Sequence, residues 1–201
     1  MRKLTGTNYG DNRDIVWKIK DNKKYRPYIK SSVKAFMKDN PPPLKILDMG
    51  AREGYGTKLF KKYGYEVVGT DIVAGYVKFA QKRGRNVIFD DITDSKFSSN
   101  TFDAIFARHS FHYCRSAKMV LDTFRRILKP KGFICVIIPI QSKKTFLKAE
   151  HPGLVSMQYY ESVNIFKNTL ENNGFFCKWI GPTKKYGINP QQKEILTIAY
   201  L

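Results

Sequence analysis

Residues 44–54 read Leu-Lys-Ile-Leu-Asp-Met-Gly-Ala-Arg-Glu-Gly, and this stretch decides the fold. Its first part, Leu44–Asp48, is rich in apolar residues and ends at an acid, a pattern that predicts a buried β-strand. Two glycines, Gly50 and Gly54, follow in a loop. Glycine lets backbone amides approach a ligand closely, and a helix that begins after such a loop offers further N–H donors. The stretch therefore predicts a strand, a ligand-binding turn and the start of a helix.

The alternation of strand and helix continues along the chain. Further strands are predicted at Glu66–Thr70, Asn86–Phe89, Phe102–Ala107, Phe133–Ile138, Phe175–Ile180 and Ile195–Tyr200. Apolar residues at helical spacing predict helices at 57–63, 73–83, 116–128 and 159–170. This order is typical of βαβ units whose parallel sheet is covered by helices on both faces. We therefore expect an α/β fold: a single Rossmann-like, doubly wound domain with a mostly parallel seven-stranded sheet and an antiparallel last strand.

Length and composition place the domain within the chain. The chain has 201 residues, which fits one domain of ordinary size. Residues 1–40 are predicted to form a basic helical extension, in which Pro27 lies in the first turn of a helix that runs to about Lys38. The run Asn40–Pro43 stops that helix, so residues 41–201 are expected to form the α/β domain. No apolar run approaches the roughly 18–20 residues that a membrane span needs, and the N-terminus lacks the apolar stretch of a signal peptide.

The chain is strongly basic. It holds 36 Lys and Arg against 17 Asp and Glu, a formal net charge of +19. Such an excess indicates an anionic partner, which could be nucleic acid, a membrane surface or an acidic substrate. A lysine-rich composition of the whole chain is the alternative explanation, although it does not account for the scarcity of acids. Charge bears on association and not on fold, so both explanations are kept.

The cysteines and histidines bear on compartment and metals. Three cysteines, Cys114, Cys135 and Cys177, lie far apart and form no CxxC pair. An odd number at this spacing argues against a disulfide framework and against a zinc knuckle. The three histidines are scattered without ligand spacing, so no metal site is expected. A reducing, cytoplasmic location is the prediction.

Acids follow the first three predicted strands. Asp48 ends the first strand, Asp71 the second, and Asp91 follows the third. In doubly wound sheets, ligands bind beyond the carboxyl ends of the strands, and an acid at the second of these places accepts the hydroxyls of a ribose. A third acid can accept from an exocyclic amine such as adenine N6. Each acid alone is explained as a helix N-cap, but three of them beside a glycine turn indicate a nucleoside site.

These residues carry a resemblance to a known family. Ile46–Gly54 resembles the first motif of the class I S-adenosylmethionine-dependent methyltransferases, and Asp91–Asp103 is similar to the segment that joins their third and fourth strands. Arg108–Tyr113 resembles the motif after the fourth strand, and Leu121–Gly132 the helix and turn before the fifth. The resemblance covers about residues 44–138. It is closest to the subgroup that mostly methylates small molecules, lipids or sugars.

The resemblance implies S-adenosyl-L-methionine as the cofactor. It implies that Asp48 orients the ammonium group, Asp71 holds the ribose and Asp91 accepts from adenine N6. The other cofactor-binding residues that it implies are Gly50, Ala51, Arg52 and Gly54 of the loop, and Ile72, Ile92 and Arg108 at later strand ends. Arg52 departs from the family pattern, because it replaces the middle glycine of the first motif. A nicotinamide cofactor does not fit, since an acid and not a glycine comes first after the strand.

The implied reaction is methyl transfer to an O or N atom of a small, glycan-type or lipid-type acceptor, and the basic charge favours an anionic one. In such a transfer the protein mainly positions and dehydrates the reactants. Some acceptors also need a general base, and His112 and His151 are predicted for this role. They are chosen from a set that also contains His109, Tyr113, Tyr159 and Tyr160. The segments expected to reach the acceptor are 17–28, 109–113 and 141–160.

Two other functions are kept as alternatives. The basic residues between 13 and 38, interleaved with Trp17, Tyr25 and Tyr28, favour RNA or another nucleic acid as the acceptor. A solvated amphipathic helix explains the same residues. The chain could also bind the cofactor without catalysis, as a partner subunit, but retention of the acids and glycines argues against a degenerate site.

Overall fold

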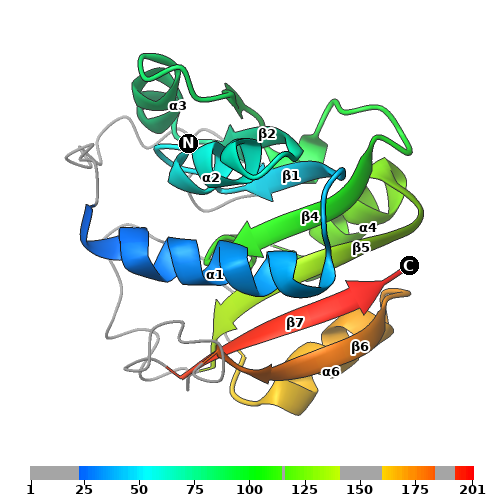
Figure 1. Cartoon of the computed structure of the whole chain (residues 1–201). Coiled ribbons are helices and arrows are strands. Elements are labelled where there is room, and N and C mark those ends of the chain that lie inside the picture. Colours follow the sequence, from blue (N-terminus) through cyan, green and yellow to red (C-terminus); the bar gives the residue numbers. More distant parts are fainter. Residues whose placement is uncertain (1–22, 115, 141–159, 184–192) are drawn as a thin grey trace, which may run out of the picture.

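The structure is a computed structural model, and it describes residues 23–114, 116–140, 160–183 and 193–201. Its strands form one seven-stranded sheet with the order β3-β2-β1-β4-β5-β7-β6 (Figure 1). The strands are β1 (Lys45–Met49), β2 (Glu66–Asp71), β3 (Val87–Phe89), β4 (Phe102–Arg108), β5 (Leu128–Pro139), β6 (Phe176–Pro182) and β7 (Glu194–Tyr200). All neighbouring pairs from β3 to β5 are parallel, and β7 is antiparallel to both β5 and β6. The predicted doubly wound α/β fold with an antiparallel last strand is confirmed.

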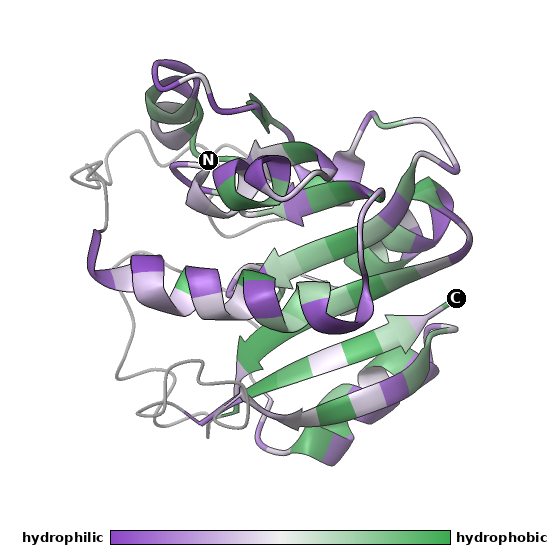
Figure 2. Ribbon diagram, in the orientation of Figure 1, coloured by the Kyte–Doolittle hydropathy of each residue, from purple (hydrophilic) through white to green (hydrophobic). Residues whose placement is uncertain are grey.

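Helices cover both faces of this sheet. They are α1 (Arg26–Asp39), α2 (Tyr55–Lys62), α3 (Ala74–Gln81), α4 (Ala117–Ile127) and α6 (Val163–Glu171), with short 3-10 turns η1 (Lys23–Tyr25), η2 (Ile92–Asp94) and η3 (Phe111–Tyr113). In Figure 1, α1 and α2 lie in front of the sheet, and α4 and α6 lie behind it. Figure 2 shows mostly hydrophobic central strands and helices that mix hydrophilic and hydrophobic residues. Within the described residues, the structure contains no helix with the length and apolar character of a membrane span.

The central strands contribute to a separate core on each face. In β1, Ile46 packs with the residues of α1 and α2, whereas Leu47 packs with those of α4 and α6. In β4, Phe106 packs in the core with α1 and α2, and Ile105 packs in the core with α4 and α6. Successive side chains of a strand point to opposite faces, so a strand with helices on both sides must be apolar at every position. This explains the unbroken apolar run Ile134–Ile138 in β5.

Helix α1 is part of the front core. Phe36 is fully buried, and its ring centroid lies 5.3 Å from that of Phe60 and 5.7 Å from that of Phe133. The predicted boundary at residue 40 therefore falls between α1 and β1, two elements that share one core. Residues 1–22 of the predicted extension lie outside the described part of the chain.

The predicted turn at Lys129–Gly132 takes a different form. The sequence predicts that these residues end a helix and that a strand begins at Phe133, but β5 already begins at Leu128. The pairing with β4 passes from Phe102–Leu128 to Ala104–Phe133, so that residues 129–132 bulge out of the ladder. An extra segment of this kind bends a strand without ending it. As a result α4 runs directly into β5.

The topology also determines where a ligand can bind. The chain turns back from β1 through β2 to β3 and then crosses to β4 on the other side of β1. A crevice forms beyond the carboxyl ends of the strands where the order reverses. In this sheet that place lies between the ends of β1 and β4.

Candidate functional site

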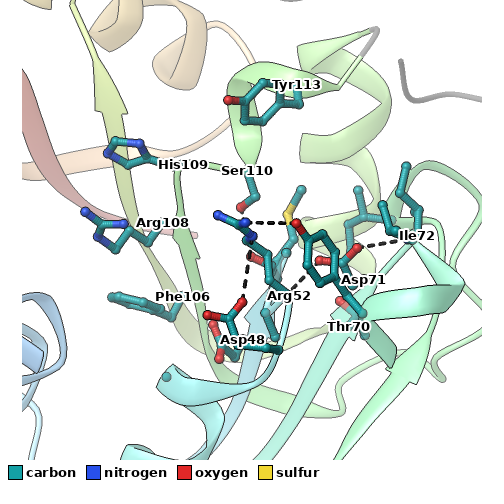
Figure 3. A pocket seen from close by; sticks show the side chains of 18 of the residues that line it. Asp48, Arg52, Thr70, Asp71, Ile72, Phe106, Arg108, His109, Ser110 and Tyr113 are labelled. Carbon is teal, nitrogen blue, oxygen red and sulfur yellow. Dashed lines mark hydrogen bonds and ion pairs between the residues drawn. The ribbon is translucent and has the colours of Figure 1, made fainter. Parts of the chain in front are cut away.

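A cavity of about 360 Å³ opens at this reversal point, a size that is usual for a small-molecule site. Its walls come from the loops after β1 and β2 and from the segments after β3 and β4, and Tyr25 and Ile29 of the N-terminal helical region complete them. Figure 3 shows the side chains that line it. The predicted cofactor residues on its walls are Asp48, Gly50, Ala51, Arg52, Asp71, Ile72, Ile92 and Arg108.

Gly50 joins the loop after β1 to the segment after β4. Its backbone is left-handed, with φ 70°, and a Cβ atom placed on it would lie 2.4 Å from Cβ of Ser110. The hydroxyl of Ser110 donates a hydrogen bond to the carbonyl of Met49, 2.8 Å away. Only glycine fits at this position, because both the backbone conformation and the close approach of Ser110 exclude a side chain.

Arg52 has a backbone conformation that favours glycine. Its φ is 49°, which lies in the left-handed region. The Arg52 N–H donates to Oδ2 of Asp71 at 2.9 Å, and its guanidinium donates to the hydroxyl of Tyr76 at 2.9 Å. The guanidinium carbon also lies 5.0 Å from the centroid of the Tyr76 ring. These contacts hold the arginine in the cavity wall.

Gly54 supports the loop from outside the cavity. It has φ 72°, and a Cβ atom there would lie 2.7 Å from Cγ2 of Val87. Its N–H donates to the carbonyl of Ala51 at 2.7 Å. Gly54 is therefore a turn residue behind the wall, and it does not line the cavity as the other predicted loop residues do.

Asp48 and Asp71 are buried carboxyls on the cavity wall. Asp48 accepts a hydrogen bond from the hydroxyl of Thr57 at 2.7 Å. Asp71 accepts one N–H at each oxygen, from Arg52 and from Val73, both at 2.9 Å. Burial raises the pKa of each carboxyl from 3.8 to about 6, against the opposing effect of these hydrogen bonds. A ligand that places positive charge or hydroxyl donors here would favour the ionised form.

A further acid, Glu53, was not predicted from the sequence. It lines the cavity and is buried, and its Oε2 atom lies 3.8 Å from Nε of Arg52 without a hydrogen-bond partner within the described part of the chain. A buried oxygen without a donor is costly, so it marks a place where a ligand could donate. The position inside the glycine loop was the only signal in the sequence.

The acid after β3 that lines the cavity is Asp90, whereas the prediction selected its neighbour Asp91. The Oδ1 atom of Asp91 accepts from the N–H of Thr93 at 3.0 Å and from its hydroxyl at 2.8 Å, which caps η2. In contrast, Oδ2 of Asp90 is buried without a hydrogen-bond partner among the described residues, and burial raises the pKa of this carboxyl. The sequence Asp-Asp cannot distinguish these roles, because they depend on which carboxyl caps the turn.

The segment after β4 contributes cationic and aromatic groups. Arg108, His109, Ser110 and Tyr113 all line the cavity. In Figure 3, Arg108 and His109 lie on one side of the cavity, and Asp71 and Ile72 lie on the other. Nε of Arg108 donates to the hydroxyl of Ser32 at 3.1 Å, which joins β4 to α1. The cavity thus has an acidic side and a basic side.

His109 has a partner that is remote in sequence. Its Nε2 atom lies 2.8 Å from Oε1 of Glu194, the first residue of β7. The Glu194 side chain is fully buried, and a quarter of the His109 side chain is exposed (0% and 25%). His109 also has a left-handed backbone, with φ 54°. No local pattern in the sequence points to Glu194, because only the pairing of β7 with β5 brings it to this place.

His112, a predicted catalytic base, does not line the cavity. It is buried in η3, and its ring centroid lies 4.3 Å from that of Tyr113 and 6.0 Å from that of His109. Burial, together with the neighbouring His109, holds the pKa of His112 well below its usual value. The histidine that the structure places on the wall is His109.

Other predicted residues lie outside the described ranges. His151 and nearly all of the predicted acceptor loop, residues 141–159, belong to the part that the structure does not describe. Of the predicted N-terminal acceptor segment, Tyr25 is described and lines the cavity. Within the described residues, no group of three His, Cys, Asp or Glu side chains could hold a metal ion.

Comparison with known proteins adds a family match. Residues 47–136 match the family described as a methyltransferase domain. Phosphoethanolamine N-methyltransferase 1 of Arabidopsis thaliana is 28% identical over 143 residues, which are 67% of this chain and 29% of that protein. Malonyl-[acyl-carrier protein] O-methyltransferase 1 of Coxiella burnetii is 30% identical over 94 residues, 46% of this chain and 32% of that protein. The chain thus spans less than a third of the length of these curated relatives.

The same fold occurs in a solved structure. The PH0226 protein from Pyrococcus horikoshii superposes with a TM-score of 0.71 over 90% of this chain and 92% of that one. The two sequences are 19% identical, so the likeness concerns the fold alone.

Proposed function

We propose that this chain, whose residues 47–136 match a methyltransferase domain, is a class I S-adenosylmethionine-dependent methyltransferase that binds S-adenosyl-L-methionine in the described cavity and transfers its methyl group to a small acceptor. The observation that carries this proposal is the convergence of the strand-end acids and the glycine loop on one cavity. When bound, the cofactor supplies a methyl group on a positively charged sulfur.

The residues of the cavity fit this cofactor. Asp71 presents a carboxylate whose position is fixed by two backbone N–H groups, as a ribose-binding acid requires. Gly50 lets the loop after β1 pass close to Ser110 in the cavity wall, where a side chain would clash. Glu53 and Asp90 each have a buried carboxylate oxygen that accepts no hydrogen bond from the described residues. The cofactor carries an ammonium group and an adenine amine, which could donate to these oxygens. Ile72 and Ile92 add apolar wall for a base.

The chain's own residues mainly bind and orient in this proposal. The acidic side, with Asp48, Glu53 and Asp71, holds the positively charged and hydroxyl-bearing parts of the cofactor. These acids are buried, and charge interactions are stronger there than in bulk water. We assign the basic side, with Arg108 and His109, to the acceptor, so that Arg108 takes this role in place of the cofactor contact that the resemblance implies. Holding two reactants in line in this way supplies most of what methyl transfer needs.

The acceptor that we propose is small and carries an anionic group. Arg108 lies on the cavity wall opposite Asp71 (Figure 3) and is available there to pair with a carboxylate or phosphate. The exposed lysines of α1, which are Lys30, Lys34 and Lys38, do not line the cavity. An acceptor atom must enter the cavity, so we favour a small molecule, lipid or sugar over nucleic acid.

We also infer that the protein acts in the cytoplasm. Its three cysteines, Cys114, Cys135 and Cys177, are free thiols. A reducing compartment keeps thiols in this state.

Replacing Asp71 by Ala should weaken the binding of S-adenosylmethionine and S-adenosylhomocysteine by roughly 1.5–3 kcal/mol, the range for hydrogen bonds to a charged group. This corresponds to an affinity loss of roughly 10- to 150-fold in isothermal titration calorimetry. Asp122→Ala, on the surface of α4, is the matched control and should leave the affinity unchanged. If well-folded wild-type chain binds neither compound, the proposed function fails. An unchanged affinity of the Asp71 variant removes only the ribose role.

Cofactor affinity should rise with pH. The pKa of Asp48 and of Asp71 is about 6 in the folded chain, above the ordinary value of 3.8, because burial disfavours the ionised form. Below pH 6 the two carboxyls hold protons that a cationic ligand must displace, so affinity should fall roughly 10- to 100-fold from about pH 7 to about pH 5. Asp71→Asn should flatten this dependence. Calorimetry that finds the same affinity at both pH values contradicts the assignment.

The raised pKa values of Asp48 and Asp71 also affect stability, which should fall as the pH rises, whereas ligand affinity should increase. Both carboxyls bind protons more tightly in the folded chain than in the unfolded one. Their contribution to the free energy of unfolding is therefore full below about pH 4 and is lost as the pH rises through about 6. The chain without cofactor should lose this contribution in urea titrations over the same range in which ligand affinity increases.

The two acids after β3 should respond differently to replacement. Asp90→Ala should weaken cofactor binding by roughly 1.5–3 kcal/mol, because Asp90 is the acid after β3 that lines the cavity. Asp91→Ala should instead lower the free energy of unfolding by roughly 0.5–2 kcal/mol, because it removes the cap of η2. Calorimetry and urea unfolding of both variants measure the two effects. The reverse pattern would restore Asp91 as the adenine ligand.

A further inference from the structure

A histidine and a glutamate meet on the basic side of the cavity without a role in cofactor binding. His109 follows β4, Glu194 begins β7, and Nε2 of His109 lies 2.8 Å from Oε1 of Glu194. The glutamate is fully buried behind the histidine, and only the histidine lines the cavity. The order from the cavity inward is thus imidazole and then carboxylate.

The backbone of His109 is held in an uncommon conformation. Its φ of 54° is unfavourable for a histidine, and its N–H is fixed by a 2.9 Å hydrogen bond to the carbonyl of Ile137 in β5. Strained residues of this kind persist where the surrounding structure imposes them, and they are concentrated at active sites. Here the strain keeps the ring between Glu194 and the cavity, on the side of Arg108 (Figure 3).

We propose that His109 is a general base for the methyl acceptor and that Glu194 positions it. The contact between Nε2 and the carboxylate is a 2.8 Å ion-pair distance that does not meet hydrogen-bond geometry, and the negative charge of Glu194 favours the proton on Nε2. Nδ1 then carries the lone pair that accepts a proton. Glu194 also stabilises the imidazolium that forms. This proposal rests on the proposed methyltransferase function and adds to it the catalytic group and the chemical class of the acceptor.

In this step a proton transfer to His109 is coupled to a displacement at the methyl carbon. The acceptor O–H or N–H loses its proton to Nδ1 of His109, and the lone pair on that O or N atom forms the bond to the methyl carbon. The bond from this carbon to the sulfonium sulfur breaks, and its electron pair stays on the sulfur, which becomes a neutral thioether. The imidazolium then releases the proton to water.

The charged groups around His109 keep it neutral before the step. Burial lowers the pKa of His109, Glu194 of β7 raises it, and Arg108 of β4 and Arg52 of the loop after β1 lower it further. The remaining titratable neighbour, His112 of η3, has a lowered pKa as well. A neutral imidazole is the form that can accept a proton at neutral pH.

The pair also restricts the acceptor. A carboxylate oxygen has no proton to lose, so an enzyme that makes methyl esters gains nothing from a base. An amine or a hydroxyl must lose a proton to become a neutral product. The pair of His109 and Glu194 therefore favours an acceptor with an amine or hydroxyl nucleophile, beside an anionic group that Arg108 can hold.

The experiment measures label transfer from methyl-labelled S-adenosylmethionine to phosphoethanolamine and to the deproteinised small-molecule fraction of a cell lysate. The product is then treated with mild alkali, which releases methyl esters as methanol but leaves N-methyl groups and ethers intact. We expect alkali-stable label from the wild-type chain. We expect His109→Asn, which suits a left-handed backbone, to lower transfer by roughly 100-fold or more. Affinity for S-adenosylhomocysteine should stay within about twofold.

Glu194→Gln tests the positioning role separately. Loss of the carboxylate should lower the pKa of His109, so the acid limb of the kcat/KM profile should move to lower pH while the maximum falls about tenfold. A histidine NMR titration of the chain without cofactor should show the same downward shift for His109. Glu171→Gln, on the surface of α6, is the matched control and should alter neither measurement.

The outcomes separate the two proposals. Alkali-labile label, or unchanged transfer by His109→Asn, overturns the base and leaves the methyltransferase function in place. A Glu194→Gln variant with an unmoved pH profile and an unmoved His109 titration overturns the positioning role. Absence of transfer to both probes by a wild-type chain that binds S-adenosylhomocysteine contradicts the proposed function and the base together.

Discussion

Replacing Phe36 by Ala should lower the free energy of unfolding by about 3–5 kcal/mol, the usual cost of removing a buried phenylalanine. Phe36 is fully buried between α1 and the sheet, and its ring contacts the rings of Phe60 and Phe133. The cavity left by the substitution cannot close easily, because the partners are held by the strands and by α2. Urea unfolding monitored by circular dichroism measures the loss.

Lys34→Ala is the matched control, because Lys34 lies on the exposed face of the same helix. It should change the free energy of unfolding by less than about 0.5 kcal/mol. A loss below about 1 kcal/mol for Phe36→Ala would mean that α1 is a separable extension, as a domain boundary at residue 40 suggests. The expected larger loss would show one cooperative unit on both sides of that boundary.

Replacing Gly50 by Ala should abolish measurable cofactor binding and destabilise the fold. The left-handed backbone costs a non-glycine residue roughly 1–2 kcal/mol. A Cβ atom 2.4 Å from Cβ of Ser110 requires the loop to move, which adds roughly 1–3 kcal/mol. The movement would displace the amides and acids that bind the cofactor, so we expect an affinity loss of more than about 100-fold by calorimetry.

Gly84 provides a control that separates the two costs. It has φ 64°, close to that of Gly50, but a Cβ atom on it would meet no atom within 4 Å. Gly84→Ala should therefore show only the backbone cost and should keep cofactor affinity. Ser110→Gly added to Gly50→Ala removes the clashing carbon and should recover part of the affinity. Equal effects of the two alanine variants would contradict the steric explanation.

The order of elements could be predicted from the sequence because local patterns encode it. The apolar runs in β1 and β4 and the helical spacing in α4 each reflect burial against neighbouring elements, and the observed bounds differ from the predicted ones by a few residues. The exception is the start of β5 at Leu128. Lys131 has φ 64°, a left-handed conformation typical of turns, and the sequence Pro-Lys-Gly predicts a turn here. The pairing with β4 on both sides of these residues shows that they form a bulge within β5.

The candidate site was predictable where one strand end carries one distinctive residue. Asp48 and Asp71 are single acids at the ends of buried strands, and the structure places both on the cavity wall. The choice between Asp90 and Asp91 depends on a capping bond that the sequence does not specify. Glu194 lies far from every motif, and only the insertion of β7 beside β5 brings it to His109.

The position of β7 has a consequence for synthesis on the ribosome. β7 lies between β5 and β6, although both of these strands precede it in the chain. In the described structure β6 pairs with β7 alone, so the emerging polypeptide exposes an open edge of β5 and an unpaired β6 until residues 194–200 have left the exit tunnel. Open edges invite pairing with other chains. Until then the growing chain is prone to aggregate, and this gives chaperones a defined interval in which to act.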